Sequence, residues 1–164
     1  MKFFVLKAAI LAILLISGCS EDFQDDEVLA IPDFYVIGTN NNDRDETPVI
    51  DPYESAGIFD IFAKISKPDL GFDLNLYVGG QESLRDATQL YSLECTNDDE
   101  FCYAPNYYSI GCVLEPDMTG NCFGQTFNLT NQFTQLPFSG YILIEVCHRI
   151  QNRCVVQSER VLFR

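Results

Sequence analysis

The chain has 164 residues, of which 24 are acidic, 10 are Lys or Arg and one is His, so its net charge at pH 7 is −14. This length fits one domain with a short tether, and a hydrophobic content of 47% excludes a wholly disordered protein. The negative charge argues against binding to nucleic acid and against electrostatic docking on anionic lipid, because phosphates attract Lys and Arg.

The first eighteen residues have the pattern of a secretory signal peptide. Lys2 and Lys7 precede or flank a short apolar run over residues 8–16, and small residues follow it. Nine helical residues rise about 13 Å, which is less than half of the ~30 Å hydrocarbon core of a membrane. The sequence therefore predicts export rather than a normal membrane-spanning helix.

The signal peptide ends in Leu15-Ile16-Ser17-Gly18-Cys19. This segment resembles the lipobox of bacterial lipoproteins, in which an aliphatic residue and two small residues precede an obligatory Cys. The resemblance implies cleavage before Cys19, a diacylglyceryl group on its sulfur and an acyl chain such as palmitate on its new amino terminus. Several acyl chains anchor a protein firmly. Ser20, in place of an Asp, implies sorting to the outer membrane.

Three segments are therefore expected: a signal peptide over residues 1–18, a lipidated Cys19 with an acidic tether over 19–30, and one folded domain over 31–164. Loss of Lys2 and Lys7 with the signal peptide changes the net charge from −14 to −16. Eleven tether residues reach at most ~40 Å, which keeps the domain close to its membrane. Such a high charge favours a monomer.

Seven cysteines are present, and lipid attachment accounts for Cys19. Six Cys allow fifteen full pairings, but proximity favours three pairs that each enclose a polar, turn-like segment. These pairs are Cys95–Cys102, Cys112–Cys122 and Cys147–Cys154. After export their oxidation is expected, and each disulfide should contribute about 2.5–3 kcal/mol in the chain-entropy model. Zinc is the disfavoured alternative, because no pair has C-x-x-C spacing.

Hydrophobic residues recur with a period of two along the domain, which is typical of strands with one solvated face. The strand candidates are residues 34–38, 58–66, 72–78, 89–95, 107–114, 122–129, 141–148 and 154–163. Turn residues at 67–69, 79–80, 115–117 and 119–121 separate them, and only 81–87 has a faintly helical pattern. About eight strands predict an all-β antiparallel β-sandwich stapled by three disulfides, with a jelly roll or small barrel as the alternative.

The stretch from Leu136 to Phe163 resembles the last hairpin of immunoglobulin-like or fibronectin-like domains. In those domains a Leu-Pro turn leads to a Tyr that opens the strand, as Leu136-Pro137 leads to Tyr141 here. The resemblance implies an immunoglobulin-like sandwich. The sequence departs from the immunoglobulin pattern because it has no Trp and because its Cys pairs are expected within hairpins rather than between sheets.

Two residues are candidates for catalysis. His148 is the only imidazole, but no G-x-S-x-G motif accompanies it and Cys147 is expected to be oxidised, so we expect an exposed turn histidine. Glu145 lies in an otherwise apolar strand, where partial burial would raise its pKa. The favoured interpretation is that Glu145 faces outward and pairs with Arg160 across the hairpin.

Acidic loops and one aromatic segment are candidates for binding. Calcium would need six to eight oxygens, and none of the acidic loops matches an EF-hand, so solvated loops are favoured and no other cofactor is expected. The candidate calcium ligands are Asp43, Asp45, Glu46, Asp98 and Asp99. The aromatic segment over residues 101–108 suits stacking on a sugar or a partner protein, or it fills the core. Its candidate binding residues are Tyr103, Asn106, Tyr107 and Tyr108.

These features predict an outer-membrane-anchored lipoprotein that displays a non-catalytic acidic β-sandwich for binding or structural interaction at the cell envelope. Its expected partners are the membrane, through the lipid anchor, and an envelope protein or glycan, but not nucleic acid. One alternative is a small inhibitor of an exported hydrolase such as lysozyme, because an acidic domain suits a basic target. The other is a glycosidase that uses two carboxylates about 5 to 9 Å apart.

Overall fold

The structure is a computed structural model, which describes residues 29–66, 71–96, 102, 107–133 and 135–164. Two β-sheets make up most of it. The ten strands are β1 (Ala30–Ile37), β2 (Val49–Ile50), β3 (Ile58–Ser66), β4 (Phe72–Gly79), β5 (Thr88–Cys95), β6 (Tyr108–Leu114), β7 (Thr119–Cys122), β8 (Gln125–Asn128), β9 (Phe138–His148) and β10 (Arg153–Phe163). A short 3-10 turn, η1 (Ser55–Gly57), precedes β3. Within these described segments, no helix has the length and apolar character needed to cross a membrane.

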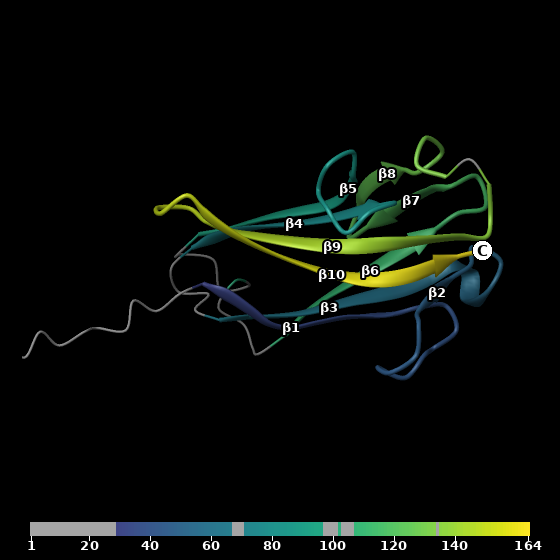
Figure 1. Ribbon diagram of the computed structural model, residues 1–164, viewed down its shortest axis with the longest axis horizontal. Helices are drawn as coiled ribbons and strands as arrows, with labels where there is room; N and C mark the ends of the chain where they lie inside the picture. The colour runs from purple at the N-terminus through teal and green to yellow at the C-terminus, as the bar shows by residue number, and fades with distance from the viewer. Residues whose placement is uncertain (1–28, 67–70, 97–101, 103–106, 134) are drawn as a thin grey trace, which may run out of the picture.

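The first sheet has the strand order β1-β3-β6-β7-β8 and the second β2-β10-β9-β4-β5. Figure 1 shows the sheets as two layers, with the β9–β10 turn at the end of the sandwich opposite the C-terminus. All neighbouring strands are antiparallel except β2 and β10, which pair in parallel over two residues. The prediction of an antiparallel β-sandwich with three disulfides is thus confirmed, although it has ten strands rather than about eight.

The chain passes back and forth between the two sheets of the sandwich. It runs from β3 in the first sheet to β4 and β5 in the second, returns to the first at β6, and ends with β9 and β10 in the second. The hairpin of β7 and β8 lies between β6 and β9 in the sequence and widens the first sheet. This added hairpin carries part of the candidate site described below.

The β7–β8 hairpin corrects two details of the prediction. Residues 119–121 were expected to form a turn but lie in β7, and the strand expected over 122–129 is interrupted by a turn at Phe123 and Gly124. Both turn residues have positive φ, 47° and 85°, which a continuous strand does not allow.

The segment over residues 81–87, which was expected to be faintly helical, forms turns and bends instead, and Asp86 in it also has a positive φ.

The core lies between the sheets and follows the predicted alternation. In β4, Phe72, Leu74 and Leu76 are fully buried, whereas their polar neighbours lie on the outer face. Leu29 is also buried in the core, so the folded domain includes Leu29 and Ala30, which precede the expected boundary at residue 31. The expected signal peptide, Cys19 and most of the expected tether lie outside the described residues.

The three disulfides join the predicted pairs. Cys112 in β6 lies directly opposite Cys122 in β7, and Cys147 in β9 lies directly opposite Cys154 in β10. The Cys112–Cys122 pair is buried, whereas Cys154 is exposed on the outer face of the second sheet. The predicted pairing is therefore confirmed for all six residues, and the hairpin interpretation is confirmed for the Cys112–Cys122 and Cys147–Cys154 pairs.

His148 is buried, with 4% of its surface exposed, and this contradicts the expectation of an exposed turn histidine. Its Nδ1 accepts hydrogen bonds from the backbone N–H groups of Ile150 and Gln151, both at 3.0 Å. The imidazole therefore acts as an acceptor that holds the β9–β10 turn, which requires an unprotonated Nδ1. This structural use explains why a polar ring is buried at the end of β9.

Candidate functional site

The outer face of the first sheet carries an ordered column of three side chains across β1 and β3. Tyr35 lies directly opposite Phe62 in the register, and their rings stack with centroids 4.8 Å apart and planes inclined by 9°. The guanidinium carbon of Arg44, which comes from the loop after β1, lies 3.8 Å from the centre of the Tyr35 ring. We call the column of Arg44, Tyr35 and Phe62 the Arg44 stack.

Asp33 fixes the position of the Arg44 stack. Its Oδ2 accepts a hydrogen bond from Arg44 Nη2 at 2.5 Å and another from the Tyr107 hydroxyl at 2.7 Å. Lys64 lies opposite Asp33 in the register, with its Nζ 6.0 Å from the centre of the Tyr107 ring. The hydrogen bond from Arg44 and, to a smaller extent, that from Tyr107 hold the pKa of Asp33 below its usual value. The bond to Asp33 in turn raises the pKa of the Tyr107 hydroxyl.

The Asp33 carboxyl is expected to titrate below its ordinary pKa of about 3.9. Because its folded-state pKa is lowered, its contribution to stability is present above that ordinary value and is lost as the pH falls through the lowered one. Carbon-13 NMR of the carboxyl group measures this titration. Arg44→Gln should raise the Asp33 midpoint, whereas Arg85→Gln, on a remote loop, should not; equal midpoints in both variants would contradict the pairing.

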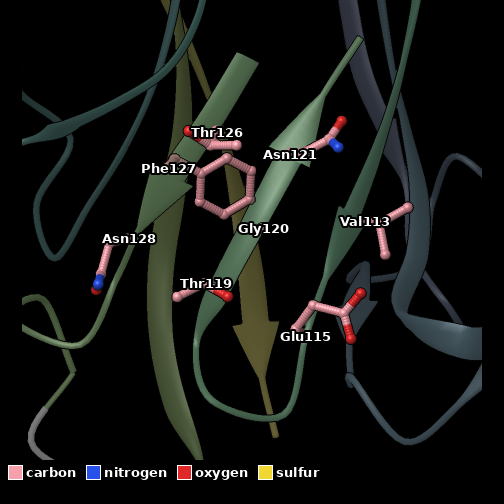
Figure 2. Close-up of a pocket in the computed structure, with 8 residues that line it drawn as sticks. All are labelled: Val113, Glu115, Thr119, Gly120, Asn121, Thr126, Phe127 and Asn128. Carbon is pink, nitrogen blue, oxygen red and sulfur yellow. The ribbon is translucent and has the colours of Figure 1, made fainter. Parts of the chain in front are cut away.

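An open hollow of about 520 Å³ lies further along the same outer face, on β6, β7 and β8 (Figure 2). Its lining residues are Val113, Glu115, Thr119, Gly120, Asn121, Thr126, Phe127 and Asn128. Paired residues connect the hollow to β3, the strand that carries Phe62 of the Arg44 stack. Exposed Ile58 in β3 lies opposite Val113 in β6, and Val113 lies opposite Asn121 in β7. The stack and the hollow are therefore two parts of one face.

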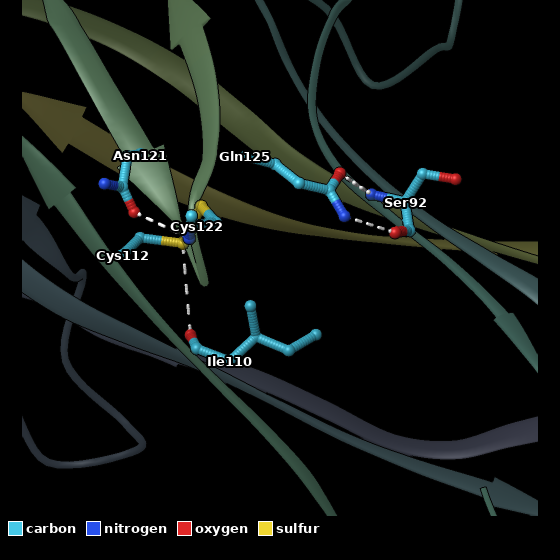
Figure 3. Close-up of a disulfide and its surroundings, with 7 residues drawn as sticks. Ser92, Ile110, Cys112, Asn121, Cys122 and Gln125 are labelled. Atoms are coloured by element: carbon cyan, nitrogen blue, oxygen red, sulfur yellow. Dashed lines mark hydrogen bonds between the residues drawn. A yellow bond between two sulfur atoms is a disulfide. The ribbon is translucent and has the colours of Figure 1, made fainter. Parts of the chain in front are cut away.

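The walls of the hollow are held by the Cys112–Cys122 disulfide and by Gln125 (Figure 3). The disulfide fixes β7 against β6 on the inner face. Gln125 of β8 reaches the edge of the second sheet, where its Nε2 donates to the carbonyl of Ser92 at 2.7 Å and its Oε1 accepts from the Ser92 N–H at 2.8 Å. This pair of bonds closes the edge between β8 and β5, so the hollow rests on a restrained hairpin.

Of the four aromatic-segment candidates, Tyr107 is 42% exposed and lies beside the Arg44 stack. Tyr108 was a candidate for binding, but it is buried, as the core-filling alternative predicted; its hydroxyl donates to the carbonyl of Cys102, and burial raises its pKa to about 12. The reason is the period of two, which sends neighbouring side chains to opposite faces of β6. Tyr103 and Asn106 lie outside the described residues.

The candidate calcium ligands do not converge in the part of the chain that the structure describes. Asp43, Asp45 and Glu46 are exposed on the loop after β1, and Asp98 and Asp99 lie outside the described residues. Among described residues, only Glu145, Cys147 and Cys154 bring three potential ligand atoms within 4.8 Å of one another. Cys147 and Cys154 form a disulfide with each other, so this group offers one carboxylate.

Glu145 faces outward as expected, but its expected partner was wrong. The register of β9 and β10 places Val156 opposite Glu145, and Arg160 instead donates to the Ser139 hydroxyl at 3.0 Å. Glu145 Oε2 accepts hydrogen bonds from the Tyr77 hydroxyl at 3.2 Å and from Asn75 at 3.4 Å. Glu145 thus lies in a polar row on the outer face of the second sheet. The partial burial of Tyr77, followed in size by the negative charge of Glu145, raises the pKa of the Tyr77 hydroxyl.

The residues of the Arg44 stack were not predicted from the sequence, although one signal was visible. In residues 58–66, Phe62 shares the solvated phase with Asp60 and Lys64, and a large aromatic residue there marks an exposed platform. Arg44 gave no comparable signal, because a charged residue in an acidic loop has the pattern of any solvated loop. Comparison with protein-family models, curated proteins and solved structures found no match for the chain.

Proposed function

We propose that this chain is an outer-membrane-anchored lipoprotein whose acidic β-sandwich binds, without catalysis, a protein partner at the cell envelope through the Arg44 stack. The observation that carries the proposal is that Arg44 is exposed and Tyr35 is partly exposed to solvent, and yet both are held in place by Asp33 and Phe62. Arg and aromatic residues are enriched in the cores of protein interfaces, and prior ordering reduces the entropy lost on binding.

The arrangement of the rings favours a protein over a sugar at the stack. A sugar that stacks on an aromatic residue needs a free ring face. Arg44 and Phe62 both lie against the ring of Tyr35, at 3.8 Å and 4.8 Å from its centre. The Tyr35 ring therefore offers a partner its edge and its hydroxyl beside the Arg44 guanidinium, which suit the mixed apolar and polar contacts of a protein interface.

The charge around the stack favours a basic partner. The loop that supplies Arg44 also exposes Asp43, Asp45 and Glu46, while the charge of Arg44 is neutralised by Asp33. Surplus carboxylates accelerate encounter with a positively charged protein. This observation supports a second candidate function, inhibition of a basic exported hydrolase such as lysozyme.

A carboxylate-dependent glycosidase has less support. Two hollows lie on the described part of the chain, one of about 520 Å³ on β6, β7 and β8 and one of about 480 Å³ on the second sheet, and each has one carboxylate in its lining, Glu115 and Glu82 respectively. Glycoside hydrolysis uses two facing carboxylates. Glu145 lines neither hollow.

Capture of the partner tests the proposal. The lipidated full chain, cross-linked in its own envelope, should retain a specific protein that Arg44→Ala and Tyr35→Ala each lose, with affinity about 30-fold lower for a loss of about 2 kcal/mol. Arg85→Ala is the matched control, because Arg85 is an exposed arginine on another loop. A partner retained equally by all variants would refute the role of the stack.

Two further measurements separate the remaining parts of the proposal. Cys19→Ser should release the chain from the membrane fraction, because it removes the thiol that the lipobox resemblance assigns to lipid. A lysozyme assay distinguishes the inhibitor, whose effect should disappear in the Arg44→Ala variant. A Cys19→Ser variant that stays in the outer membrane would exclude the lipid anchor.

A further inference from the structure

We propose that the hollow on β6, β7 and β8 is a binding site for a neutral sugar unit, separate from the protein-binding stack. Its side chains display hydrogen-bond donors and acceptors in fixed directions, with partly exposed Val113 beside them, and the buried Phe127 ring forms part of its floor (Figure 2). Its volume of about 520 Å³ lies within the usual range of about 300–1,000 Å³ for small-molecule sites.

Two asparagines give the hollow its fixed donors. Asn121 Oδ1 accepts the backbone N–H of Gly124 at 3.0 Å, and Asn128 Oδ1 accepts the N–H of Thr130 at 2.9 Å and its hydroxyl at 2.7 Å. Neither amide can be reversed without losing these bonds, so each Nδ2 is held as the free end of its side chain. Among described residues, neither Nδ2 donates a hydrogen bond to the protein.

Acceptors and hydroxyls complete the set. Thr126 lies opposite Asn121 and Thr119 lies opposite Asn128, so amide and hydroxyl groups alternate across the two strands. Glu115, at the end of β6, adds an exposed carboxylate. A sugar hydroxyl can accept from an asparagine Nδ2 and donate to a carboxylate at the same time, which matches this mixture.

Other ligand classes fit the lining less well. No Lys, Arg or His lines the hollow, which disfavours a phosphate or another anion, and the single carboxylate is too few for a metal ion. A peptide backbone pairs with the N–H and C=O groups at a strand edge, whereas a ligand on a sheet face meets only side chains. A neutral, hydroxyl-rich ring is the class that remains.

Asn→Asp substitutions test the site without removing the turns. Asp keeps an oxygen that accepts the backbone N–H, but it replaces the Nδ2 donor by a second acceptor. Asn121→Asp and Asn128→Asp should therefore fold normally and bind sugar about tenfold more weakly. Asn152→Asp in the β9–β10 turn is the control, because it makes the same charge change far from the hollow.

The readout is nitrogen-15 NMR of the side-chain amides in the full lipidated chain, held in a detergent without a sugar head group. The probes are three neutral trisaccharides: maltotriose, cellotriose and tri-N-acetylchitotriose. At least one should shift the Asn121 and Asn128 amide signals at about 10 mM, tenfold above a Kd of ~1 mM. No shift with any probe, or equal binding by the Asn→Asp variants, would overturn the site; Arg44→Ala should leave sugar binding unchanged whether or not the protein partner exists.

Discussion

Substitution of Gly57 by Ala is expected to lower the free energy of unfolding by about 3–5 kcal/mol, a large part of the 5–15 kcal/mol typical of a domain. Gly57 ends the 3-10 turn before β3 with φ at +70°, where Ala costs about 1–2 kcal/mol. A Cβ there would also lie 2.0 Å from the carbonyl oxygen of Leu114 at the end of β6. Backbone must therefore move, which disturbs the β3–β6 pairing and can be measured by urea unfolding.

Gly124 provides the matched control. It too has a positive φ, +85°, but a Cβ at this position would meet no atom within 4 Å. Gly124→Ala should therefore cost only the conformational strain, about 1–2 kcal/mol. If the two substitutions destabilise the protein equally, the close approach of the η1 turn to β6 is not what requires glycine at position 57.

The cysteine pairing could be predicted because it depends on local structure. Each pair encloses a polar segment of hairpin length, and the structure places Cys112 opposite Cys122 and Cys147 opposite Cys154 in antiparallel registers. The alternation in β4 was equally informative, since an inward Leu74 fixes the direction of every neighbour along the strand. Local pattern thus determined strand phase over much of the core.

The errors arose where tertiary packing overrides local preference. Thr119-Gly120-Asn121 has the composition of a turn, yet all three residues lie in β7. A Cβ at position 120 would come 2.3 Å from the Phe127 ring and from the Val113 carbonyl oxygen. Glycine is thus needed for close packing rather than for a turn. The outward-facing Glu145 was anticipated, but its register against β10 was not, and the Arg160 pairing was wrong.

The candidate site was less predictable than the fold because its contacts are far apart in the sequence. Asp33 contacts Arg44 across 11 positions and Tyr107 across 74. A sequence pattern fixes which face Tyr35 occupies, but it does not indicate which loop folds back over that face. The aromatic segment at 101–108 was a sound starting point, since Tyr107 does reach the outer face while Tyr108 turns into the core.

Reduction of all three disulfides is expected to unfold the domain. The enclosed loops are short, with sequence separations of 7, 10 and 7, and each cross-link should contribute about 2.5–3 kcal/mol by restricting the unfolded chain. Together they amount to about 8 kcal/mol, which is comparable with the whole stability of a typical domain. Circular dichroism before and after reduction by a dithiol measures the loss of strand structure.

Separate Cys→Ala pairs show where the stabilisation resides. Replacing Cys112 and Cys122 should cost about 3 kcal/mol plus the loss of buried packing, whereas replacing Cys147 and Cys154 should cost no more than about 3 kcal/mol, because Cys154 is exposed. Exposure also predicts that a mild dithiol opens Cys147–Cys154 before Cys112–Cys122, as alkylation and mass spectrometry would record. A fully reduced chain that keeps its sheet signal would show that the cross-links are not needed for folding. If the buried Cys112–Cys122 pair opened first, exposure would not determine the order of reduction.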